Sequence, residues 1–182
     1  MYIEMQAEQF FNAYQVLSEN NEALIDRLAS SSEESHIGQK AVGTRPTMGV
    51  EIVCLAFSLE LYIKDLHYAI KGEAPRGHNI LELFEKLPEQ TRHEIFSHDA
   101  ISQNPFFTRG NIMLTKRFAN DFSAYDGFLE QIELISDGFE KWRYSYESAA
   151  LHYDVSFALA LIESIKSAAS KVRQENDNGR RK

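Results

Sequence analysis

The sequence of 182 residues contains one cysteine and no long apolar run. A single cysteine excludes an intramolecular disulfide and a zinc site built on several cysteines. No segment approaches the ~20 consecutive apolar residues that a membrane-spanning helix needs. The first residues carry acidic side chains where a secretory signal carries basic ones. We therefore expect a protein that does not enter a membrane and that stays in the cytoplasm.

The usual catalytic and cofactor signatures are also missing. The chain has no glycine-rich phosphate loop, no His-Glu-x-x-His pair, no Gly-x-Ser-x-Gly turn and no Glu-x-x-His pair for a di-iron centre. We therefore expect neither a cofactor nor a bound metal. Sustained two-residue alternation of β-branched residues is absent as well, so the sequence does not support a sheet.

Composition is that of an ordinary globular protein, with 43% hydrophobic and 25% charged residues. This length predicts a single domain, which we place at residues 1–175, followed by a flexible C-terminal tail at 176–182. The net charge of −8 argues against general attraction to nucleic acid, although a local basic groove remains compatible with it.

Apolar residues recur every three or four positions along most of the chain, which predicts amphipathic helices. The fold class expected is all-α, an antiparallel four-helix up-and-down bundle with additional short helices. Residues 30–47 lack periodicity and predict a long loop. Asn21 interrupts the first apolar stripe, and we expect it to be solvated. The predicted helices cover residues 3–29, 48–71, 79–87, 88–96, 114–132 and 154–174.

Arg92 and His98 are the candidate catalytic pair. A guanidinium can hold a phosphodiester while an imidazole accepts the proton of a ribose 2′-hydroxyl, and this reaction needs no metal. Such spacing also occurs by chance, and surface histidines are the default interpretation.

Four further residues are candidate binding residues. His78 precedes Asn79, a predicted N-cap, and either fixes the loop by hydrogen bonds or contacts a ligand. Arg143, Tyr144 and Tyr146 belong to an aromatic segment with interleaved bases, a pattern suited to stacking on single-stranded nucleic acid. Packing of the same aromatic rings onto the bundle is the favoured alternative.

Three stretches together resemble the middle of HEPN domains. They are Ala56–Lys64 (AFSLELYIK), Lys71–Pro75 (KGEAP) and His78–Phe84 (HNILELF). The segment Trp142-Arg-Tyr144 with Tyr146-Glu147, ahead of a final helix, is similar to one branch of that superfamily. The resemblance covers roughly residues 48–170.

The resemblance implies a helical bundle that forms a homodimer in prokaryotic toxin–antitoxin or phage-defence systems. It also implies a cognate antitoxin or a nucleotidyltransferase as a protein partner. Many members are metal-independent ribonucleases with an Arg and a His a few residues apart, and others bind RNA, nucleotides or proteins without catalysis. Arg92 and His98 match those letters, but they follow a short helix rather than opening the last core helix. We therefore expect a non-catalytic binding module; the alternatives are an endoribonuclease using Arg92 and His98, and a helical adaptor unrelated to nucleic acid.

Overall fold

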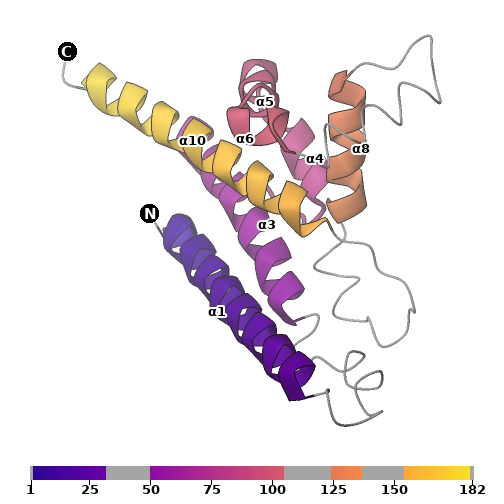
Figure 1. The fold of residues 1–182 in the computed structure, drawn as a ribbon. Coiled ribbons are helices and arrows are strands. Elements are labelled where there is room, and N and C mark those ends of the chain that lie inside the picture. Colours follow the sequence, from indigo (N-terminus) through magenta and orange to yellow (C-terminus); the bar gives the residue numbers. More distant parts are fainter. Residues whose placement is uncertain (1, 32–49, 105–123, 137–153, 181–182) are drawn as a thin grey trace.

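The computed structural model describes residues 2–31, 50–104, 124–136 and 154–180, and every regular element in these ranges is an α-helix (Figure 1). The expectation of an all-helical fold is confirmed. Within these ranges no helix is both long and apolar enough to cross a membrane. The helices are α1 (Tyr2–Ser31), α3 (Val50–Lys71), α4 (Ile80–Glu85), α5 (Glu89–Phe96), α6 (Asp99–Ser102), α8 (Ala124–Ser136) and α10 (Val155–Arg180).

Helix α3 is the centre of the fold, because both α1 and α10 pack against it. Its apolar stripe is fully buried at Leu55, Leu59, Ile63 and Leu66. The predicted central helix at 48–71 is therefore confirmed, with its first described residue at Val50. Burial of these side chains supplies most of the free energy that holds the three long helices together.

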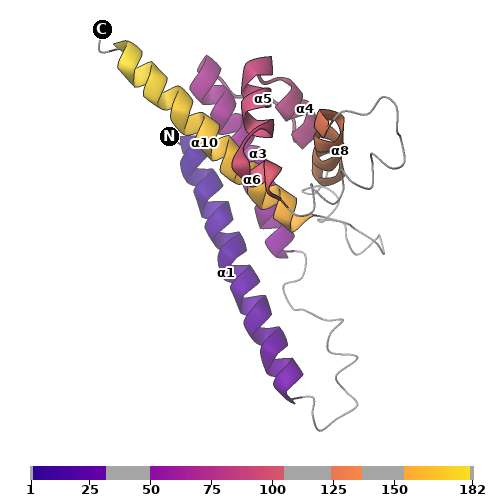
Figure 2. The same cartoon turned by 45° about the horizontal axis from the view of Figure 1, so that its top comes forward.

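The contacts between side chains set the directions of the long helices. Glu4 and Glu8 of α1 bind Arg173 and Lys166 of α10, respectively, so α1 and α10 are antiparallel. Phe10 packs on Phe57 with ring centroids 4.5 Å apart, whereas Glu4, earlier in α1, shares Arg173 with Asp65, later in α3, so α1 and α3 are antiparallel as well. Consequently α3 and α10 run parallel, and their C-terminal ends lie at the same end of the molecule, beside the start of α1 (Figure 2).

A second group of helices, α4, α5, α6 and α8, lies on the side of α3 and α10 away from α1 in both views (Figures 1 and 2). Its core is aromatic. The fully buried Phe128 of α8 lies 5.5 Å from the Phe84 ring, 5.3 Å from Phe96 and 5.8 Å from Phe157 between centroids. Because α8 makes most of its described contacts with α4, the exact four-helix antiparallel bundle stays a prediction.

The short helices agree with the expected capping and add one element. Asn79 is the N-cap of α4, since its Oδ1 accepts from the Glu82 backbone N–H at 2.9 Å. The expected loop after Phe96 instead contains α6. A four-residue helix has too few positions to show periodicity, so this turn could not be recognised from the sequence.

Two expectations need correction. The tail expected from residue 176 is helical as far as Arg180, and Asn176 donates to the carbonyl of Ala69 at 3.1 Å. Asn21 is 4% exposed rather than solvated. Most of the predicted loop at 30–47 and the start of the helix predicted at 114–132 lie outside the described residues.

Candidate functional site

A buried carboxylate organises the connection between α3 and α4. Glu60, in the middle of α3, has a side chain only 1% exposed, and its Oε1 accepts from Lys64 Nζ at 2.7 Å. The His78 Nδ1 lies 3.0 and 3.2 Å from the two oxygens of the same carboxylate. The candidate site consists of Glu60, Lys64 and His78.

Two glycines bring His78 back to α3. Gly72 has φ +78° and donates its N–H to the Tyr68 carbonyl at 2.8 Å, which ends α3. Gly77 has φ +110° immediately before His78. Residues other than glycine rarely adopt these backbone angles. A substitution at either position therefore strains the backbone of the loop that brings His78 to Glu60.

The hydrogen bond to Glu60 sets the chemistry of His78. A carboxylate only accepts hydrogen bonds, so Nδ1 is the donor and, in the neutral ring, Nε2 is the acceptor nitrogen. The His78 side chain is 56% exposed although its partner is buried. The arrangement therefore fixes the connection, as expected from the sequence, and also presents an oriented imidazole at the surface.

We expect His78→Ala to lower the free energy of unfolding by about 1 kcal/mol, because the buried Glu60 carboxylate loses one charge-assisted hydrogen bond. Denaturant unfolding measures this change. Lys86→Ala is the matched control, because that side chain is 49% exposed and its carboxylate partner Glu82 is 66% exposed at 4.0 Å. An equal loss in the two variants would show that burial of Glu60 contributes nothing.

The candidate catalytic Arg92 is directed into the interface between α5 and α8. Burial raises the pKa of Tyr125, and a hydrogen bond from Arg92 opposes that rise, which places the guanidinium against the phenol of α8. The neighbouring His93 stacks on the same ring with centroids 5.0 Å apart. Arg92 Nε is buried without a hydrogen-bond partner among the described residues. Arg92 therefore contributes to packing between helices.

His98 has a different structural role. It is the N-cap of α6, and its Nδ1 accepts from the Ala100 backbone N–H at 3.2 Å. An imidazole that accepts at Nδ1 carries its proton at Nε2 when neutral, so neither nitrogen is available as a general base in this state. Arg92 and His98 thus each have a structural contact, and their joint role as a phosphodiester site stays a prediction. Arg143, Tyr144 and Tyr146 lie outside the described residues.

A charged network between the three long helices was not recognised from the sequence. Arg173 of α10 bridges Asp65 of α3 and Glu4 of α1, with 2.9 Å between Arg173 Nη1 and Glu4 Oε1. Lys166 binds Glu8 at 2.7 Å and lies 5.1 Å from the centroid of Tyr62. The network lines a chamber of about 40 Å³, and Asp65 Oδ1 has no hydrogen-bond partner among the described residues.

The ionisation of this network follows from its burial and its pairing. Burial raises the pKa of Tyr62, and the carboxylate of Glu8 raises it further. Burial also raises the pKa of Asp65 although Arg173 opposes it. Partial burial acts against ionisation of Glu8, but hydrogen bonds from Lys166 and Tyr62 lower its pKa. Three carboxylates, Glu4, Glu8 and Asp65, thus share the two cations Arg173 and Lys166. We interpret this network as a structural clamp that holds α1 against α3 and α10.

Within the described residues, no three His, Cys, Asp or Glu side chains are grouped so that they could hold a metal ion. Comparison with protein-family models, with curated proteins and with solved structures found no match. The resemblance to HEPN domains therefore depends on the sequence segments given above.

Proposed function

We propose that this chain is a dimeric HEPN-like helical module of a prokaryotic defence or toxin–antitoxin system, which binds RNA, a nucleotide or a partner protein without cleaving RNA itself. The observation that carries the non-catalytic part is the bond from the Ala100 N–H to His98 Nδ1. A ribonuclease that used His98 as its base would first have to break this cap. Arg92, the other member of the pair, is engaged with Tyr125.

The candidate site supports a binding role at the α3–α4 connection. His78 is held by a buried carboxylate, so its orientation costs little conformational entropy when a ligand binds. Lys64 is 15% exposed and is held by the same carboxylate. A phosphate or a carboxylate of a ligand can accept from such a pair when the imidazole is protonated.

Cleavage of RNA in EDTA separates the binding module from the ribonuclease alternative. We expect no cleavage by the wild type. His98→Asn is the informative variant, because asparagine retains an N-cap acceptor but has no imidazole. Cleavage by the wild type that is lost in both His98→Asn and Arg92→Ala, and that survives in His93→Ala, would establish the ribonuclease instead.

Binding and oligomeric state test the rest of the proposal. We expect a dimer by light scattering, and binding of RNA, nucleotide or the product of a neighbouring gene that His78→Ala weakens at least severalfold. A strict monomer that binds none of the three would overturn the proposal and favour an unrelated helical adaptor.

A further inference from the structure

The first half of α1 exposes no charged side chain. Between Tyr2 and Ser18 the charged residues are Glu4 and Glu8, and both bind cations of α10. The exposed residues in this range are Tyr2, Met5, Gln9, Asn12, Gln15 and Val16. Charge returns to the exposed positions after Ser18, at Glu19, Glu22, Asp26 and Arg27. A helix at a protein surface normally exposes charged residues on its outer side, so this part of α1 differs from the rest of the same helix.

The uncharged surface is also apolar and regularly spaced. Tyr2, Met5 and Val16 are 69%, 49% and 57% exposed, and they make up half of the large apolar side chains that are exposed within the described ranges. Together with Gln9 and Asn12 they recur at alternating intervals of three and four residues, which is the spacing by which one helix packs along another. We call these five residues the outer face of α1. Depletion of charge with enrichment of Tyr and Met is typical of the centre of a protein interface.

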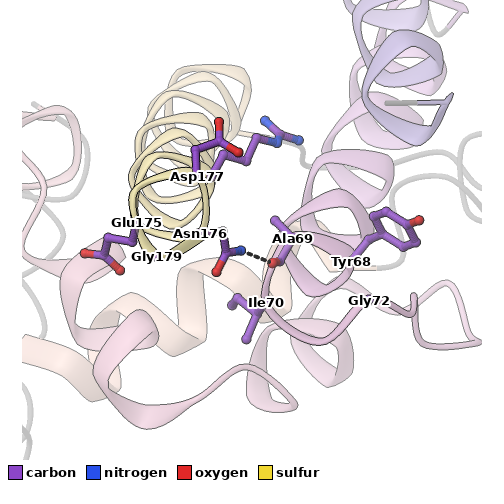
Figure 3. Close-up of a pocket in the computed structure, with 9 residues that line it drawn as sticks. Tyr68, Ala69, Ile70, Gly72, Glu175, Asn176, Asp177 and Gly179 are labelled. Carbon is purple, nitrogen blue, oxygen red and sulfur yellow. Dashed lines mark hydrogen bonds between the residues drawn. The ribbon is translucent and has the colours of Figure 1, made fainter. Parts of the chain in front are cut away.

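The position of α1 leaves this face accessible. The helix packs against α3, binds α10 through its ion pairs, and lies at the edge of the described helices in both views (Figures 1 and 2). By contrast, the groove where α3 and α10 end is lined by charges of both signs, from Arg173, Glu175 and Asp177 (Figure 3). The outer face of α1 is therefore the better candidate for a contact that excludes water.

A second copy of the chain fits this face. The net charge of −8 makes two copies repel each other wherever their carboxylates meet, and the outer face of α1 has none. Consider an antiparallel pair of α1 helices whose two-fold axis passes between Gln9 and Asn12. Met5 then lies beside Val16 of the second copy, and the Gln9 amide lies beside the Asn12 amide of the second copy, with which it can form hydrogen bonds.

The ends of the same pair are complementary too. In this register Tyr2 lies beside Glu19 of the second copy. The Tyr2 hydroxyl accepts from Gln6 Nε2 at 3.2 Å, so its own proton can be donated to that carboxylate. The antiparallel direction also opposes the two helix dipoles. One set of residues thus supplies both sides of the contact, as a two-fold interface requires.

We infer that the outer face of α1 is the homodimer interface of this protein, with the two α1 helices antiparallel. The inference deepens the dimeric part of the proposed function and rests on it. A contact between single helices is at the small end of protein interfaces, so we expect a dimer that dissociates in the micromolar range.

Cross-linking tests the face and the direction together. In a Cys54→Ala background, we expect Met5→Cys combined with Val16→Cys to form a disulfide-linked dimer with oxidised glutathione. The two positions are about 16 Å apart along one helix, so they cannot join within one chain. Met5→Cys alone should remain unlinked, because the antiparallel register separates the two copies of this residue. Leu134→Cys, which is 61% exposed on α8, is the control for accidental linking.

The dimer affinity gives an independent measurement. Met5→Glu combined with Val16→Glu should weaken the dimer about tenfold or more in analytical ultracentrifugation, because the pair then brings four carboxylates together. The matched control is Leu134→Glu combined with Ser167→Glu, which adds the same charge at exposed positions of α8 and α10 and should leave the affinity near that of the wild type. Since all four side chains are exposed, circular dichroism should show unchanged helicity in both variants.

Other results would overturn the inference. Linking of Met5→Cys alone, without linking of the double cysteine variant, would show a parallel pair. Equal weakening by the two glutamate variants would show an effect of total charge. A wild type that stays monomeric would exclude the pair, and binding of that monomer to phosphatidylcholine vesicles would assign the face to a lipid surface instead.

Failure of the inference can be told apart from failure of the proposed function. If Met5→Glu combined with Val16→Glu leaves the dimer intact, only the assignment of the face falls and the proposed function stands. A wild-type monomer that also binds no RNA, nucleotide or neighbouring gene product overturns both.

Discussion

Replacing Phe128 by alanine is expected to lower the free energy of unfolding by about 4 kcal/mol. The ring is fully buried and contacts Phe84, Phe96 and Phe157, which belong to α4, α5 and α10. Its removal leaves a cavity that all three neighbouring helices border, and rings on separate helices cannot all move inward to fill it.

Chemical denaturation with a probe of tertiary structure measures this loss. Leu134→Ala on the same helix is the control, since that side chain is 61% exposed and should change the free energy by less than about 0.5 kcal/mol. A loss below about 1 kcal/mol for Phe128→Ala would show that α8 does not pack on the rest of the fold as described.

Arg173→Met is expected to cost about 3 kcal/mol, although the arginine itself is 34% exposed. Its partner Asp65 is 3% exposed, so the variant leaves a buried carboxylate without its counter-charge. The same change releases Glu4, which removes one of the two ion pairs that join α1 to α10 among the described residues.

The cost of Arg173→Met should depend on pH in a defined direction. Burial raises the pKa of Asp65 above its unfolded value even in the wild type, so its contribution to stability is present at low pH and is lost as pH rises through the folded pKa. Without Arg173 that pKa rises further. The destabilisation should therefore be smaller near about pH 4 than near about pH 8. A variant that also carries Asp65→Asn should lose this pH dependence, and a cost independent of pH in Arg173→Met alone would contradict the clamp.

The helices could be predicted because each buries a stripe of apolar residues at helical spacing. That signal located α1, α3 and most of α10 within a few residues. It failed at α6, which is one turn long, and at the end of α10, where residues of low helix propensity remain helical. Propensity reports the preference of an isolated segment, whereas Asn176 is held by a carbonyl more than a hundred residues away in sequence.

The candidate site was harder to predict, because the spacing of residues in the sequence does not show which side chains already bond to other parts of the protein. Arg92 and His98 are the residue types of a ribonuclease pair at a suitable spacing. In the structure Arg92 contacts Tyr125, and His98 caps α6. His78 was expected from its place before the Asn79 cap. Its partner Glu60 was not, because a carboxylate on a predicted helix is by default a solvated residue. Only the fold shows that this carboxylate is buried.

The antiparallel attachment of α1 to α10 has a consequence for protein synthesis. Glu8 and Lys166 are 158 residues apart in sequence, so α1 leaves the ribosome long before its partner exists. At ~5–20 residues per second, this interval is on the order of ten to thirty seconds. During this interval α3 becomes available to pack against α1, but α10 does not. A nascent chain stalled before α10 should therefore bind chaperones, and release of the completed C-terminal helix should end that binding.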